Sequence, residues 1–71
     1  MDINTVVSEI TDKIEKFNNL EKISWYEVIE KIFNNFEYVT NENKNLILFY
    51  VVKEISKRGY FIEDYPFRLV K

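Results

Sequence analysis

Only two groupings of carboxylates in this chain could bind a hard cation or act as general acid or base. The sequence contains no His and no Cys, which excludes zinc and haem sites, thiol nucleophiles, disulfides and catalytic triads. The carboxylate groupings are Glu27, Glu30 and Glu37, and the adjacent Glu63 and Asp64. A charge run on a helix is typical of a solvated face. We therefore predict that the protein is not an enzyme.

Three alternating asparagines, Asn41, Asn43 and Asn45, have the spacing of the first ligands of a calcium-binding loop. Such a loop requires glycine at its sixth position and glutamate at its twelfth, where this chain has Leu46 and Val52. The asparagines are better explained as a loop and the start of a helix. We expect neither a metal ion nor a cofactor.

The composition predicts one folded domain over residues 1–71. Apolar residues make up 46% of the sequence, with one Gly and one Pro, which is typical of a folded chain. A chain this short can bury only a small core. Since 17% of its residues are aromatic, we expect more apolar side chains than this core can bury. Those left exposed would form a binding surface for a partner or a second subunit.

Hydrophobic periodicity predicts two amphipathic helices in the first half of the chain, at about 3–18 and 24–37. The apolar stripe of the first is Ile3, Val6, Val7, Ile10, Ile14 and Phe17. At the start of the second, Ser24 and Glu27 fit a capping box, with Ile23 and Val28 placed as a hydrophobic staple. The phase of Trp25 puts it in the core stripe of that helix.

A third helix is predicted at about 41–58, closed by Gly59. Its apolar residues fall on two faces, one made by Ile47, Leu48, Val51, Val52 and Ile55, the other by Leu46, Phe49 and Tyr50. Pro66 ends helical structure in the C-terminal segment 60–71. Two short strands, at 60–62 and 67–70, would form a hairpin there, and an extended tail along the helices is the alternative. The predicted fold is a mostly α, small three-helix bundle with a short extended or β-hairpin C-terminal element.

The leading functional hypothesis is a small protein-binding module that occupies a surface of a partner, as an inhibitor, adaptor or immunity-type protein does. Aromatic anchors with a charged rim are typical of protein interfaces. The candidate contact residues are Leu46, Phe49, Tyr50, Lys53, Lys57, Tyr60, Phe61, Tyr65 and Phe67. The alternative is that the C-terminal segment folds over this face of the third helix and buries it within the monomer.

A second hypothesis is a winged-helix or helix-turn-helix DNA-binding regulator, since three helices followed by a hairpin have that order of elements. Its groove-reading residues would be Asn41, Asn43, Lys44 and Asn45, and its phosphate contacts Lys53, Lys57, Arg58, Arg68 and Lys71. Against it, the first half of the third helix is apolar where a recognition helix presents polar and basic groups. The net charge of −2 gives no overall attraction to nucleic acid.

A third hypothesis is a structural homo-oligomer in which the surplus apolar face pairs with its own copy. The longest apolar run, Leu46 to Val52, is too short to span a membrane, and we expect a cytoplasmic protein with another protein or a second copy as partner. The absence of Ala and Gln beside abundant Asn, Ile and Lys suggests an AT-rich genome, such as that of a phage or other mobile element.

Overall fold

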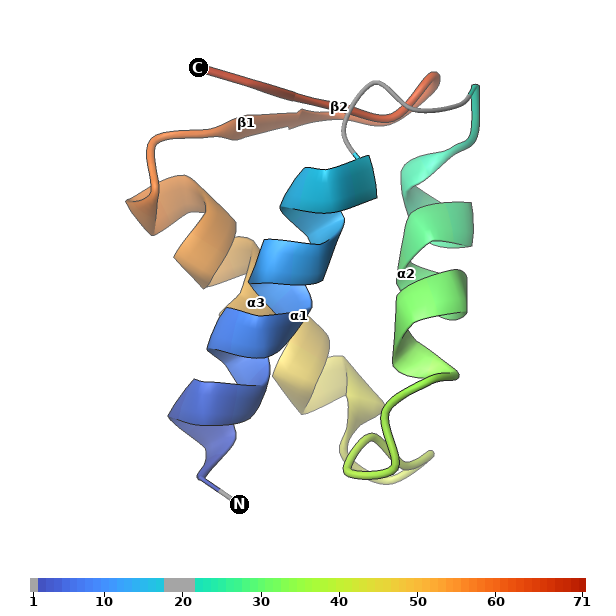
Figure 1. Cartoon of the computed structure of the whole chain (residues 1–71), viewed down its shortest axis with the longest axis vertical. Coiled ribbons are helices and arrows are strands. Elements are labelled where there is room, and N and C mark those ends of the chain that lie inside the picture. Colours follow the sequence, from blue (N-terminus) through green and yellow to red (C-terminus); the bar gives the residue numbers. More distant parts are fainter. Residues whose placement is uncertain (1, 18–21) are drawn as a thin grey trace.

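The computed structural model describes residues 2–17 and 22–71, and within them the chain forms three helices followed by a two-stranded antiparallel hairpin (Figure 1). The helices are α1 (Ile3–Phe17), α2 (Trp25–Phe33) and α3 (Lys44–Lys57), and the strands are β1 (Phe61–Glu63) and β2 (Arg68–Val70). The mostly α fold is as predicted. Of the two C-terminal alternatives, the structure has the hairpin.

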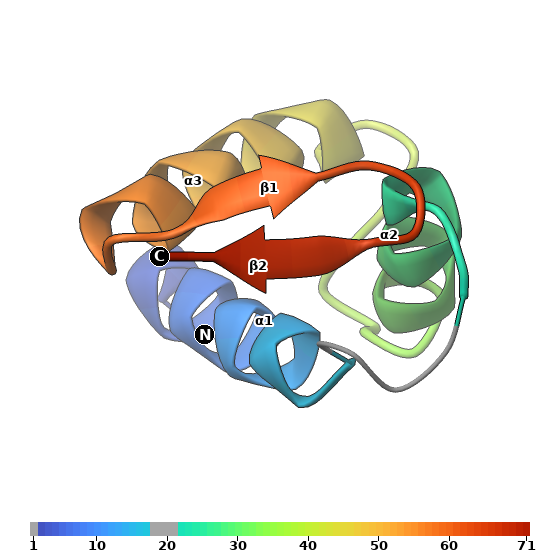
Figure 2. The ribbon, with the colours of Figure 1, turned by 90° about the horizontal axis from the view of Figure 1, so that it is seen from above.

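The hairpin closes one end of the helical bundle. Its strands pair Phe61 with Val70, Ile62 with Leu69 and Glu63 with Arg68. Because successive side chains on a strand point to opposite faces, Ile62 and Leu69 pack on the hydrophobic core. Figure 2 shows the hairpin lying across the bundle, with β1 on the side of α3 and β2 on the side of α1.

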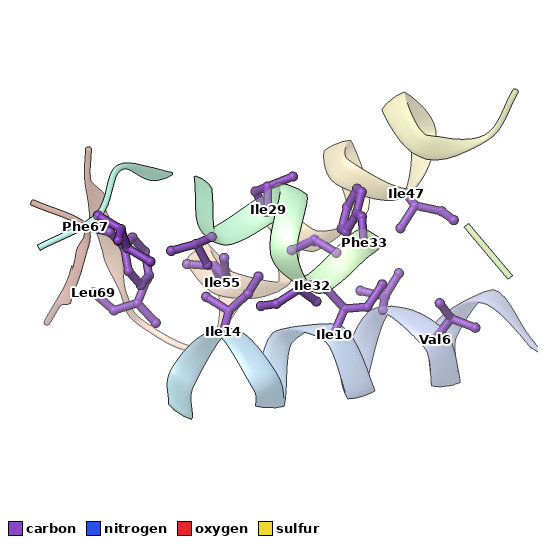
Figure 3. Packing of buried hydrophobic residues seen from close by; sticks show 14 residues of the cluster. Val6, Ile10, Ile14, Ile29, Ile32, Phe33, Ile47, Ile55, Phe67 and Leu69 are labelled. Atoms are coloured by element: carbon purple, nitrogen blue, oxygen red, sulfur yellow. The ribbon is translucent and has the colours of Figure 1, made fainter. Parts of the chain in front are cut away.

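The buried core runs along all three helices and ends beneath the hairpin (Figure 3). Its members are Val6, Val7, Ile10 and Ile14 from α1, Val28, Ile29, Ile32 and Phe33 from α2, Ile47, Val51 and Ile55 from α3, and Ile23, Phe67 and Leu69 from outside the helices. One buried polar side chain lies among them, that of Thr11. Its hydroxyl donates to the carbonyl of Val7 at 2.8 Å, so its burial costs little.

The predicted start of α2 is confirmed and its predicted end is wrong. The Oγ of Ser24 accepts from the backbone N–H of Glu27 at 3.1 Å, and the Glu27 carboxylate accepts from the Ser24 N–H at 3.4 Å. The helix then ends at Phe33 instead of residue 37. Asn34 N–H still donates to Glu30, four residues back, but the amide groups after it turn to shorter-range partners. Asn35 N–H donates to Ile32 and Phe36 N–H to Phe33, in both cases three residues back.

The third helix begins later than predicted, at Lys44 instead of residue 41. The side chain of Asn43 holds the preceding loop instead of extending the helix. Its Oδ1 accepts from Thr40 N–H at 2.7 Å and its Nδ2 donates to the Tyr38 carbonyl at 2.9 Å. The first helix was predicted to reach residue 18, which lies outside the described residues.

The predicted role of Gly59 is confirmed. Its φ of 91° lies in the left-handed region that favours glycine. Gly59 N–H donates to the Ser56 carbonyl at 2.9 Å, and Tyr60 N–H donates to the Ile55 carbonyl at 3.2 Å. These two bonds form a Schellman motif that ends α3 and turns the chain into the hairpin.

Candidate functional site

The outward side of α3 is apolar and exposed. The helix buries Ile47, Val51 and Ile55 in the core, while the side chains of Leu46, Phe49, Tyr50 and Val52 are 52%, 56%, 41% and 39% exposed. We call these four residues the α3 patch. Because α3 is apolar on two sides and the core covers only one of them, large apolar side chains remain in solvent. Such exposed apolar side chains are typical of interaction surfaces.

Val52 was predicted on the buried face of the helix with Ile47, and the structure instead exposes it in this patch. Five residues separate it from Ile47, which rotates it about 140° around the helix axis. That rotation carries it past the edge of a core-facing stripe about 100° wide. The position of Val52 on the helical wheel therefore predicts its exposure, whereas its hydrophobic character alone favours burial.

Lysines border the α3 patch. The Lys53 ammonium lies 5.3 Å from the centre of the Phe49 ring, a cation–π contact. Phe49 also meets Tyr50 edge-on, with ring centroids 5.6 Å apart. Lys57 stands one turn beyond Lys53, and both lysines line a shallow groove between α3 and the start of α1. The patch therefore combines aromatic rings with a basic rim, as predicted.

The hairpin presents a second exposed apolar group on its outer face. Phe61 and Val70 lie opposite each other in the strand register, and Tyr65 stands in the connecting turn. Phe61 and Tyr65 are each 73% exposed. We call Phe61, Tyr65 and Val70 the hairpin patch.

Two residues of the predicted contact set have other roles in the structure. Phe67 is 1% exposed and belongs to the core, so its assignment to a contact surface is wrong. It lies one residue before β2, and its side chain packs inward with that of Leu69. Tyr60 is half-buried, and its hydroxyl donates to Glu15 at 2.8 Å, which ties it to α1.

The C-terminal segment does not cover the α3 patch. It closes the end of the bundle with Ile62, Phe67 and Leu69, and Leu46, Phe49 and Tyr50 stay exposed. The alternative left open by the sequence, burial of this face within the monomer, is therefore wrong. The hydrophobic core of the described residues closes without the α3 patch.

The strongest electrostatic feature is a network around Arg58 that joins α3 to α1. Its Nη1 lies 2.8 Å from Asp12 and 2.7 Å from Glu15, and its Nε lies 2.9 Å from Glu54. Partial burial alone would lower the pKa of Arg58, but the hydrogen bonds that its guanidinium donates to Glu54 and Asp12 outweigh the burial and hold the pKa above its usual value. Three carboxylates thus balance the charge of Arg58, which was predicted to contact phosphate groups of DNA.

Other predicted nucleic-acid residues are also engaged within the chain. Arg68 pairs with Glu63 at 2.8 Å, and the Lys71 ammonium lies 5.0 Å from the centre of the Tyr60 ring. Asn43 holds the loop before α3, as described above. Asn41, Lys44 and Asn45 remain exposed at the N-terminal end of α3. The structure therefore does not gather these candidates into one basic face.

A small hollow lies between α2 and α3. Its volume is about 160 Å³, and its lining includes Tyr26, Ile29, Glu30, Phe33, Lys44 and Leu48. Tyr26 donates to Glu30 at 2.7 Å, and this hydrogen bond raises the pKa of the phenol. The hollow is smaller than the cavities that hold most small-molecule ligands.

The carboxylates of the described residues form no cluster of three or more that could hold a metal ion. Over residues 2–17 and 22–71, none of the helices has the length and hydropathy needed to cross a membrane. The fold and the site define a small mostly α domain with a C-terminal hairpin and exposed aromatic patches. No protein-family model matches the chain, and neither a curated protein nor a solved structure matches it significantly.

Proposed function

We propose that this chain is a non-enzymatic protein-binding module that acts by occupying a surface of another protein molecule. The observation that carries the proposal is that the α3 patch stays exposed after the hairpin has closed the core. Exposed aromatic residues at the centre of a patch, with long charged side chains at its edge, are the composition of binding hot spots.

The chemistry of the remaining surface supports binding over catalysis or nucleic-acid recognition. The chain has no His or Cys, and Arg58 is neutralised by three carboxylates. Such a module acts as an inhibitor, adaptor or immunity-type protein does, by covering a partner's surface. A cytoplasmic location is part of this proposal.

Photo-crosslinking tests the proposal directly. A benzophenone amino acid is placed at position 49 in the α3 patch, at position 61 in the hairpin patch, and at position 9 on the exposed side of α1 as the matched control. In cells that carry the gene, positions 49 and 61 should give discrete protein adducts that excess wild-type chain suppresses and a Phe49→Ser, Phe61→Ser double variant does not. Equal labelling from all three positions, or no adduct from either patch, would overturn the proposal.

A further inference from the structure

We propose that the α3 patch binds a second copy of this chain, with the two α3 helices antiparallel about a two-fold axis that passes between Phe49 and Tyr50. This inference rests on the proposed function, because it names the occupant of the same surface. The inference is supported by the order of charged and apolar residues along the exposed stripe of α3. When a second copy of the stripe runs in the opposite direction, acidic residues face basic ones and apolar residues face apolar groups.

The stripe consists of Glu42, Leu46, Phe49, Tyr50, Lys53 and Lys57, all exposed. Successive members are four, three, one, three and four residues apart, so the spacing reads the same in both directions. Glu42 lies in the turn before α3, and this turn already has the four-residue hydrogen-bond spacing of a helix. Lys44 N–H donates to the Thr40 carbonyl four residues back at 3.0 Å, and Asn43 has near-helical dihedral angles, φ −109° and ψ −6°.

An axis at the centre of this stripe brings together partners of matching chemistry. Phe49 of one copy meets Tyr50 of the other, and the edge-on pair within each copy extends to a group of four rings. Leu46 meets the methylene stem of Lys53, which can cover apolar surface while its ammonium stays in water. Each contact occurs twice, as a two-fold interface requires.

The charges at the two ends of the stripe decide the direction of pairing. In the antiparallel pair, Glu42 lies opposite Lys57 of the other copy, and the helix dipoles oppose each other favourably. A parallel pair would place each lysine beside its own copy and Glu42 beside Glu42, which is unfavourable. The hairpin patch is not part of this stripe, so it can bind a foreign protein.

Sedimentation equilibrium and light scattering test the charge pairing, at low salt because exposed ion pairs are screened. We expect a concentration-dependent dimer of the wild-type chain. Glu42→Lys or Lys57→Glu alone should raise the dissociation constant about tenfold, since two attractive pairs become repulsive. The double variant exchanges the charges and should restore wild-type affinity. Lys22→Glu, the same charge change away from α3, is the matched control, and circular dichroism verifies the fold of each variant.

Cysteine crosslinking tests the direction of pairing, and the native chain has no Cys to interfere. The L46C, K53C double variant should form an intermolecular disulfide on mild oxidation, mapped by mass spectrometry to positions 46 and 53 of different chains. Each single variant should stay largely uncrosslinked, because seven residues of helix put like positions about 10 Å apart. Efficient crosslinking of a single variant to itself would overturn the antiparallel arrangement.

A chain that remains monomeric up to about millimolar concentration would overturn the self-pairing. So would a dimer whose affinity is unchanged by Phe49→Asp. If the monomeric chain still gave the patch-specific adducts with a foreign protein, this inference would fail and the proposed function would stand. If it gave neither a dimer nor adducts, both would fail.

Discussion

The ring of Phe67 stacks on the indole of Trp25, with centroids 5.6 Å apart and planes inclined by 30°. Around this pair the backbone forms two hydrogen bonds, Phe67 N–H to the Ile23 carbonyl at 2.6 Å and Trp25 N–H to the Asp64 carbonyl at 2.9 Å. The hairpin is therefore joined to the first turn of α2 as well as covering α1 and α3. Ring stacking and backbone bonding together fix how the hairpin closes the core.

Phe67→Ala should destabilise the protein by about 3–5 kcal/mol, because it empties a fully buried site and removes the ring that stacks on Trp25. Phe61→Ala, the matched change on the outer face of the hairpin, should stay within about 0.5 kcal/mol. Urea denaturation followed by circular dichroism at one protein concentration measures both. Similar midpoints for the two variants would show that Phe67 does not support the core.

Arg58→Ala should lower the free energy of unfolding by about 1–3 kcal/mol, since it removes charged hydrogen bonds at a partly exposed site and leaves three carboxylates without their common partner. Arg58→Lys should recover little, because an ammonium lacks the planar fork that reaches several carboxylates at once. Arg68→Ala serves as the control, as its pair with Glu63 is half exposed, and it should cost less than about 1 kcal/mol. Full recovery by Arg58→Lys would contradict the role given to the fork.

Stability should fall in alkali through Tyr60. The hydrogen bond to Glu15, then burial, then the charge of Glu15 raise the pKa of the folded phenol, while an unfolded tyrosine titrates near pH 10. Above that pH the unfolded chain loses the proton first. The stabilisation is therefore complete below about pH 10 and is lost as the pH rises through the folded pKa.

Tyr60→Phe removes the titrating group and should give a smaller loss of urea midpoint between pH 8 and pH 11 than the wild-type chain shows. Glu15→Gln should reduce the same loss, because it removes the carboxylate that stabilises the neutral phenol. Midpoints that fall equally in all three proteins would show that the bond between Tyr60 and Glu15 does not control the alkaline transition.

Duplex DNA should not bind this chain appreciably at 50 mM salt. The net charge is −2, and two of the predicted phosphate contacts, Arg58 and Arg68, are paired with carboxylates, so the release of counterions from phosphates gains little from either. Fluorescence anisotropy with a labelled duplex provides the measurement. Binding that weakens steeply with salt and is lost in both Lys44→Glu and Arg68→Glu would instead support the winged-helix hypothesis.

Features that depend on neighbours in sequence could be predicted, and the capping box is the clearest case. Ser24 and Glu27 are three residues apart, so their spacing alone predicts the two bonds that the structure contains. The same holds for the left-handed Gly59 at the end of α3. The three helices and their buried stripes follow from periodicity of the same local kind.

Features that depend on distant partners could not be predicted in this way. Whether Phe61 or Phe67 faces the core is decided by how the hairpin lies on the helices, and both residues look alike in the sequence. The sequence alone indicates that Arg58 is an unpaired cation. Its partners Asp12 and Glu15 lie more than forty positions away and come into contact with it only in the folded chain. The α3 patch was predicted for Leu46, Phe49 and Tyr50, but only the position of the hairpin decides that this face stays uncovered.

The place of Phe67 and Leu69 in the core also determines when this domain can fold during synthesis. Both residues follow all three helices in the chain, yet their side chains cover the same end of the bundle as Ile14 and Ile55 (Figure 3). Contacts between positions so far apart form more slowly than those within a helix. A growing chain that has reached Gly59 thus holds every helix but lacks the side chains that cover this end of the core, so folding is completed only after β2 has left the ribosome.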